Sequence, residues 1–148
     1  MKASVEINAT IDKVVKLFMD KNHLKDWKKG FVSYEHISGT PNDAGAVTKM
    51  IYKRNVMIET ILSINLPDEI IAEYEHIQGG STMMFHKATN RFTSLGKSKT
   101  LYVLDGEITK VNGILLKFLM KLSPNEGNKQ AQEQLNMFKL LAEKKYNK

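Results

Sequence analysis

Residues 56–78 read VMIETILSINLPDEIIAEYEHIQ, and this stretch decides the fold class. Apolar side chains occupy the even positions from Val56 to Leu66, with Thr60 among them, while Glu59 falls on the other face. Pro67-Asp68 predicts a turn. After the turn the even positions continue with Ile70, Ala72, Tyr74 and His76. Because alternation with period two is typical of a strand with one buried face, we predict a hairpin whose even-numbered residues point inward.

Further strands are predicted on both sides of this hairpin. A loop over residues 39–45 precedes a strand from Ala46 to Arg54. Turns at residues 78–80 and 95–97 bound strands from Ser81 towards Thr93 and from Lys99 to Thr109. Asp105-Gly106 is a turn signal inside the last of these, so we expect a bulge or bend there. The middle of the chain therefore consists of hairpins in series.

Helical patterns lie at the two ends of the chain. After a strand over residues 4–9, apolar residues recur at spacings of three and four from Ile11 to Phe18, and a second short helix is expected from His23 to Trp27. Trp27 is interpreted as a packing anchor, although a ligand could stack on it. This order of elements predicts one α+β domain over residues 1–148.

The C-terminal part is predicted to form two helical pieces or one kinked helix. Residues 123–126, Ser-Pro-Asn-Glu, match a capping box, which favours a break near Ser123. Beyond it Ala131, Leu135, Phe138 and Ala142 share one face, which the sheet should cover. The apolar helix over residues 114–122 could rest on an anionic membrane through Lys117 and Lys121, but burial against the sheet requires fewer assumptions.

Composition excludes several classes of protein. The absence of cysteine removes disulfides, thiolate metal sites and cysteine nucleophiles. The net charge of +6 comes from scattered lysines with only two arginines, so no nucleic-acid partner is expected. No apolar stretch is long enough to span a bilayer, and residues 1–10 lack the apolar core of a signal peptide. These features predict a cytoplasmic location and no transmembrane segment.

The chain resembles the START-like (SRPBCC) superfamily, which includes the polyketide cyclase/dehydrase-like proteins. The residues that carry the resemblance are the run Thr10 to Phe18, the segment Asp20 to Gly30 with Trp27, and Gly39 and Gly45 before a strand. The resemblance covers essentially the whole chain. It implies a helix-grip fold, in which a seven-stranded curved antiparallel sheet surrounds a long C-terminal helix, with two short helices after the first strand. It also implies a hydrophobic cavity between sheet and helix.

A set of inward-facing residues is predicted to line that cavity and to contact a ligand. The even-numbered phase of the strands selects Met50, Tyr52, Ile58, Thr60, Leu62, Tyr74, His76, Met84 and His86, and the helices add Phe118 and Phe138. A mostly apolar wall with a few polar groups is typical of a small-molecule pocket, and methionines let it adapt. The same pattern is equally typical of a packed core.

The histidines do not predict a metal site, because His23, His36, His76 and His86 lack the spacing of zinc ligands. No phosphate-binding or dinucleotide-binding glycine motif is present either, so no cofactor is expected. His76 and His86 could instead orient a carbonyl or hydroxyl group or transfer a proton. The inward phase of His86 depends on a strand register that the run of residues 83–85 leaves open.

Three functions are compatible with these features. The leading hypothesis is a binding or carrier protein for a hydrophobic small molecule, lipid-like or polyketide-like, which Tyr52, Tyr74 or His76 would orient. The alternatives are a cyclase/dehydratase-like enzyme that uses His76 or His86 as a base, and a ligand-free module that binds a partner protein. The expected oligomeric state is a monomer or a homodimer.

Overall fold

A computed structural model describes residues 1–122 and 125–147 of the chain. Seven antiparallel strands form one sheet with the order β1-β7-β6-β5-β4-β3-β2. The strands are β1 (Lys2–Ile7), β2 (Phe31–Ser38), β3 (Val47–Tyr52), β4 (Val56–Asn65), β5 (Glu69–Gln78), β6 (Ser81–Gly96) and β7 (Lys99–Val111). The helices are α1 (Ile11–Met19), the 3-10 helix η1 (Lys21–His23), α2 (Leu24–Trp27), α3 (Ile114–Leu122) and α4 (Glu126–Tyr146).

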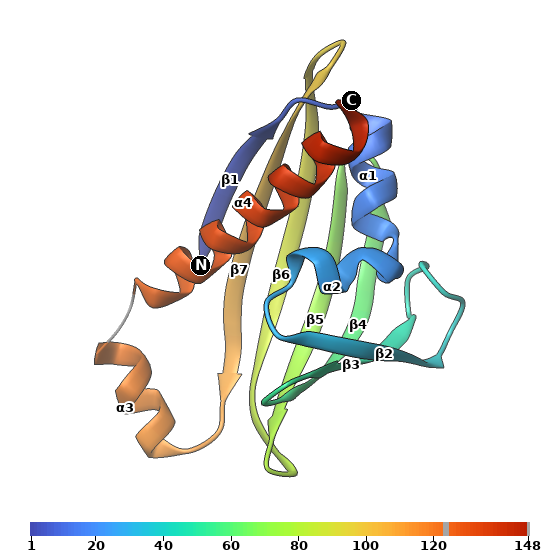
Figure 1. The fold of residues 1–148 in the computed structure, drawn as a ribbon. Helices are drawn as coiled ribbons and strands as arrows, with labels where there is room; N and C mark the ends of the chain where they lie inside the picture. The colour runs from blue at the N-terminus through green and yellow to red at the C-terminus, as the bar shows by residue number, and fades with distance from the viewer. Residues whose placement is uncertain (123–124, 148) are drawn as a thin grey trace.

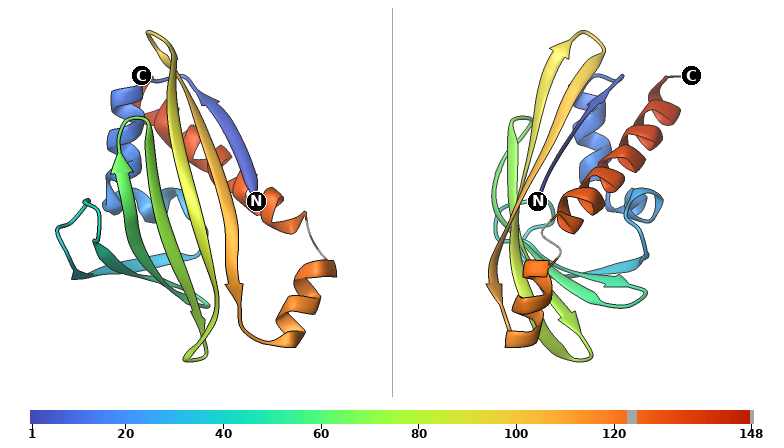
Figure 2. Two further views of the ribbon diagram at one scale, coloured as in Figure 1. Left: turned by 180° about the vertical axis from the view of Figure 1, so that it is seen from behind. Right: turned by 90° about the vertical axis from the view of Figure 1, so that its left-hand side faces the viewer.

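The sheet is strongly curved, and α1, α2 and α4 all lie on its concave face (Figures 1 and 2). The 21-residue helix α4 crosses that face and packs mainly against β1 and α2. The predicted helix-grip architecture is therefore confirmed: a seven-stranded curved antiparallel sheet, a long C-terminal helix, and short helices after the first strand.

An aromatic cluster holds the helices to the sheet. Phe138 of α4 is fully buried, and its ring centroid lies 4.9 Å from that of Trp27 and 5.4 Å from that of Tyr102. Phe18 of α1 packs edge-on against Phe92, at 5.1 Å. Edge-to-face aromatic pairs of this kind add stabilisation beyond the area they bury. Trp27, 3 % exposed, is the packing anchor that its position predicts.

The first half of β4 turns the opposite face inward from the one predicted, because the strand has a β-bulge at Leu62. Met57 pairs with His76 and Glu59 with Tyr74, so the odd positions face inward there. The register shifts between Ile61 and Ser63, after which even positions face inward again. An extra residue reverses the phase of a strand, and the sequence alternation alone does not reveal it.

The bulge expected at Asp105-Gly106 is also absent, because Gly106 pairs in register with Ala88. The irregularity lies further along β7, opposite Phe85 and His86. Gly106 instead allows a close approach: a Cβ atom there would lie 2.6 Å from Cε of Met1. The backbones of Met1 and Gly106 are hydrogen-bonded in both directions, at 2.7 and 2.8 Å.

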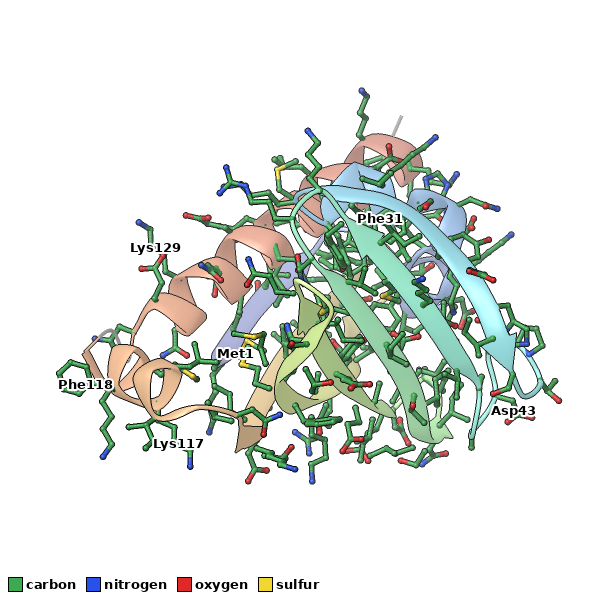
Figure 3. All side chains as sticks on the ribbon, turned by 90° about the horizontal axis from the view of Figure 1, so that it is seen from below. Met1, Phe31, Asp43, Lys117, Phe118 and Lys129 are labelled. Atoms are coloured by element: carbon green, nitrogen blue, oxygen red, sulfur yellow. The ribbon has the colours of Figure 1, made fainter. Side chains whose placement is uncertain are left out.

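Two apolar side chains of helix α3 are exposed, although burial of this helix against the sheet was expected. Its residues Ile114 and Phe118 are 88 % and 58 % exposed, and the helix lies beside the lower end of β7 (Figure 1), with Phe118 pointing away from the sheet (Figure 3). The predicted break between two C-terminal helices is present, between Leu122 and Glu126. The predicted capping box includes Ser123 and Pro124, which lie outside the described residues.

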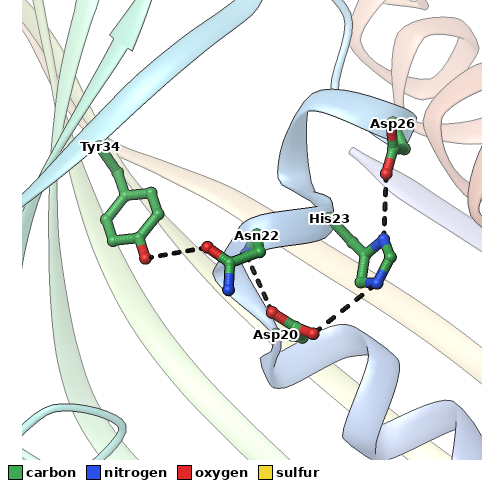
Figure 4. A network of polar contacts seen from close by, with 5 residues as sticks. All are labelled: Asp20, Asn22, His23, Asp26 and Tyr34. Atoms are coloured by element: carbon green, nitrogen blue, oxygen red, sulfur yellow. Dashed lines mark hydrogen bonds and ion pairs between the residues drawn. The ribbon is translucent and has the colours of Figure 1, made fainter.

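A polar network fixes the segment between α1 and α2 (Figure 4). His23 lies between two carboxylates, with Nδ1 3.0 Å from Asp26 and Nε2 3.7 Å from Asp20. Asp20 also accepts a hydrogen bond from the backbone N–H of Asn22, whose side chain in turn accepts one from Tyr34 of β2. These contacts position α2, whose C-terminal end carries Trp27 and Lys28 into the concave side of the sheet.

Candidate functional site

A cavity of about 540 Å³ lies between the sheet and the helices. Ligand pockets in proteins typically measure roughly 300–1,000 Å³, so its size suits a small molecule. Its wall combines residues from the helices and from β3 to β7, together with Met1. Ile108, Glu126 and Gln130 line the cavity and are also exposed, which places an opening between β7 and the start of α4.

Five of the predicted ligand contacts lie on the cavity wall: Tyr52, Tyr74, His76, Met84 and His86. Their strands explain this placement, because Tyr74 pairs with His86 and His76 pairs with Met84 across β5 and β6. Directly paired residues in an antiparallel sheet point to the same face. The strand register, which the sequence left open, therefore turns His86 inward. The residue is 8 % exposed.

The other predicted contacts lie elsewhere. Ile58, Thr60 and Leu62 are on the outer face of β4 because of the bulge, and Leu62 is 48 % exposed. Met50 lines a separate hollow of about 40 Å³. Phe138 is fully buried behind the wall formed by Trp27 and Tyr102, and Phe118 projects from α3 into solvent (Figure 3).

A buried carboxylate lies beside the cavity. Glu59 is 8 % exposed, and its Oε2 accepts a hydrogen bond of 2.7 Å from the Tyr74 hydroxyl. Lys21 Nζ lies 4.0 Å from its other oxygen. Burial, together with the negative charge of Glu59, raises the pKa of Tyr74 well above its ordinary value, so this hydroxyl keeps its proton. Sequence alternation placed Glu59 on the outer face, and this is wrong.

The two inward histidines form a pair. His76 Nε2 and His86 Nδ1 are 2.5 Å apart, so a single proton lies between the rings. His86 also stacks on Tyr74, with ring centroids 4.8 Å apart and an interplanar angle of 13°. Burial, followed by the neighbouring His76, lowers the pKa of His86 to about 3, and burial lowers that of His76. Both rings are therefore neutral at pH 7.

The most important cavity residue that the sequence analysis missed is Lys28. Its Nζ lies 5.1 Å from the Trp27 ring centroid and 5.7 Å from that of Tyr74. Lys28 is one of many scattered lysines, and no sequence signal distinguishes it. Asn90 and Tyr102, which are hydrogen-bonded to each other at 2.7 Å, were also missed. Extending the even-numbered phase along β6 and β7 would have found both.

Nowhere in residues 1–122 and 125–147 do three or more metal-ligating side chains come together. Among the helices that the structure describes, none combines the length and the apolar character needed to cross a bilayer.

The curved sheet, the long helix that it grips and the cavity between them define a helix-grip protein. A model of the family described as polyketide cyclase/dehydrase and lipid transport matches residues 1–143. The chain belongs to this family, which confirms the resemblance to the START-like superfamily. No curated protein matches the chain.

Solved structures share this fold at low sequence identity. The Zhui aromatase/cyclase from Streptomyces sp. R1128 is 12 % identical with a TM-score of 0.73, and the match covers 97 % of this chain and 92 % of the other. A hypothetical protein from Helicobacter pylori is 12 % identical with a TM-score of 0.72, covering 96 % and 88 %. A conserved protein from Geobacillus kaustophilus is 17 % identical with a TM-score of 0.68, covering 98 % and 95 %. Identities this low show the fold alone.

Proposed function

We propose that the protein binds a hydrophobic small molecule, lipid-like or polyketide-like, in the cavity between the sheet and α4. The observation that carries this proposal is the cavity of about 540 Å³, which opens between β7 and the start of α4. Transfer of a ligand from water to the apolar part of this wall contributes a favourable binding free energy of about 25 cal/mol for each Å² of apolar surface buried.

The polar groups of the wall suit orientation of a ligand. The Tyr52 hydroxyl makes no hydrogen bond with the described residues, and burial raises its pKa, so it stays a neutral donor. The Tyr74 hydroxyl is already engaged with Glu59, and the two histidines are bonded to each other. Because the two candidate bases, His76 and His86, are bonded to each other in this way, binding is favoured over catalysis as the primary role.

The test begins with native mass spectrometry of the purified protein beside the same sample denatured, which detects a co-purifying molecule. Binding is then measured by the fluorescence of the apolar probe N-phenyl-1-naphthylamine. Ala88 lies on the cavity wall and is 4 % exposed, so Ala88→Leu adds bulk inside the cavity and should weaken probe binding.

The matched control is Ala44→Leu, which makes the same change in an exposed loop and should leave probe binding unchanged. A circular dichroism spectrum of each variant checks that it is folded. Equal probe binding by both folded variants, with no co-purifying molecule in the wild type, would overturn the proposal.

A further inference from the structure

Lys28 occupies an unusual position for a lysine. It follows α2 as its C-terminal cap, where its backbone N–H donates a 2.8 Å hydrogen bond to the carbonyl of Leu24. Its side chain then enters the cavity, with Nζ near the faces of Trp27 and Tyr74. The helix end fixes where this side chain begins, and its amine lies in the cavity beside the two aromatic rings.

No described carboxylate lies within 4.0 Å of Lys28 Nζ. Glu59, the acid whose charge acts on it, is already hydrogen-bonded to Tyr74 and faces Lys21. Burial lowers the pKa of Lys28, the charge of Glu59 opposes this, and the charge of Lys21 lowers the pKa further. The nearby imidazole of His86 is neutral at pH 7. At a given pH, a larger fraction of Lys28 is therefore in the neutral amine form than of a lysine in water.

We propose that Lys28 is a covalent binding site for carbonyl compounds, forming a reversible imine with an aldehyde or ketone that occupies the cavity. This inference rests on the proposed function, because the cavity must first hold the ligand. The amine nitrogen adds to the carbonyl carbon and gives a carbinolamine. Both amine protons then leave with the carbonyl oxygen as water, and a C=N bond remains. No oxidant or reductant takes part.

The surroundings favour this chemistry over simple ion pairing. A neutral amine offers a lone pair to a carbonyl carbon, whereas a carboxylate ligand would require the charged ammonium that burial disfavours. A bound carbonyl group held beside Nζ also reacts at a high effective concentration. Met57 and Met84 contribute apolar surface to the same wall, which suits the hydrocarbon part of such a carbonyl compound.

The test uses 2-naphthaldehyde with sodium cyanoborohydride, which reduces an imine to a stable secondary amine. At pH 7 we expect one naphthylmethyl group per chain, and peptide mapping should locate it on Lys28. Because the bound aldehyde is held beside Nζ, labelling of Lys28 should be at least about tenfold faster than that of the exposed neighbour Lys29. This preference should shrink as the pH approaches 10.5, the ordinary lysine pKa.

Two variants and a second ligand make the result decisive. Lys28→Met should lose the fast adduct and still bind 2-naphthalenemethanol, which cannot form an imine. Lys29→Met should behave as the wild type in both measurements. If the wild type binds the alcohol but its adducts are spread over surface lysines, the imine site is overturned and the binding function stands.

The remaining outcomes are also informative. If 2-naphthoate binds more tightly than the alcohol in a Lys28-dependent way and the aldehyde gives no adduct, Lys28 is an anion site and the imine proposal fails. If neither the alcohol nor the aldehyde binds, the proposed function and this inference fail together.

Discussion

At the scale of single residues, the cavity region is distinguished by ionisable side chains in buried positions: a carboxylate, a lysine and two neutral histidines. Glu59 keeps its position through the hydrogen bond from Tyr74, and Lys28 enters the same region without a carboxylate within 4.0 Å among the described residues. His76 and His86 are hydrogen-bonded to each other. Each arrangement depends on side chains from different strands or helices, so each is sensitive to pH and to substitution.

We predict that the histidine pair makes the protein sensitive to acid. The pKa of His86 is about 3 in the folded protein and near 6.5 when unfolded, so between these values the unfolded chain binds a proton that the folded one does not. The free energy of unfolding should therefore fall as the pH drops below 6.5. His86 alone accounts for a loss of about 2 kcal/mol at pH 5.

Urea denaturation at pH 7 and pH 5 measures this loss. His86→Gln should lose less stability between the two pH values than the wild type. His36→Gln, which removes an exposed histidine of β2, is the control and should lose as much as the wild type. An equal loss in all three proteins would show that His86 does not cause the acid sensitivity.

At the scale of elements, the two C-terminal helices have different roles. Helix α4 buries Ala131, Leu135, Phe138 and Ala142 against the rest of the molecule, as their spacing predicted. Helix α3 exposes Ile114 and Phe118 and contributes Met120 to the cavity wall. The apolar face of α4 therefore serves packing, whereas Ile114 and Phe118 of α3 remain exposed.

We predict that two phenylalanine substitutions separate these roles. Phe138→Ala removes a fully buried ring and should lower the free energy of unfolding by about 3–5 kcal/mol. Phe118→Ala, on exposed α3, should change it by less than about 0.5 kcal/mol. Chemical denaturation of both variants gives the comparison. A large loss for Phe118→Ala would mean that α3 packs on the domain in solution.

At the scale of the whole molecule, the cavity links ligand binding to stability. A ligand that binds only the folded state at 100 times its Kd raises the free energy of unfolding by about 2.7 kcal/mol. We expect 2-naphthalenemethanol to raise the Tm of the wild type in a concentration-dependent way, measured by thermal denaturation. Ala88→Leu should show a smaller rise at equal concentrations. The same rise in both proteins would place the binding site outside the cavity.

Apart from β2, for which no strand was assigned, the sequence by itself determined the order and type of the elements, because each depends on local periodicity and turn residues. It predicted the hairpin of β4 and β5, the break between α3 and α4, and the face of α4 that packs inward. It also gave the correct inward phase of β5, with Tyr74 and His76 on the cavity wall.

Only the tertiary structure decided which residues meet in the cavity. The bulge at Leu62 reversed the phase of β4, turning Glu59 inward and Ile58 and Thr60 outward. A bulge arises from pairing with the neighbouring strand, so alternation within one strand does not locate it. The place of Lys28 in the cavity also depends on tertiary structure. Its surroundings come from α2, β4 and β5, which are far apart in sequence and lie together only in the folded chain.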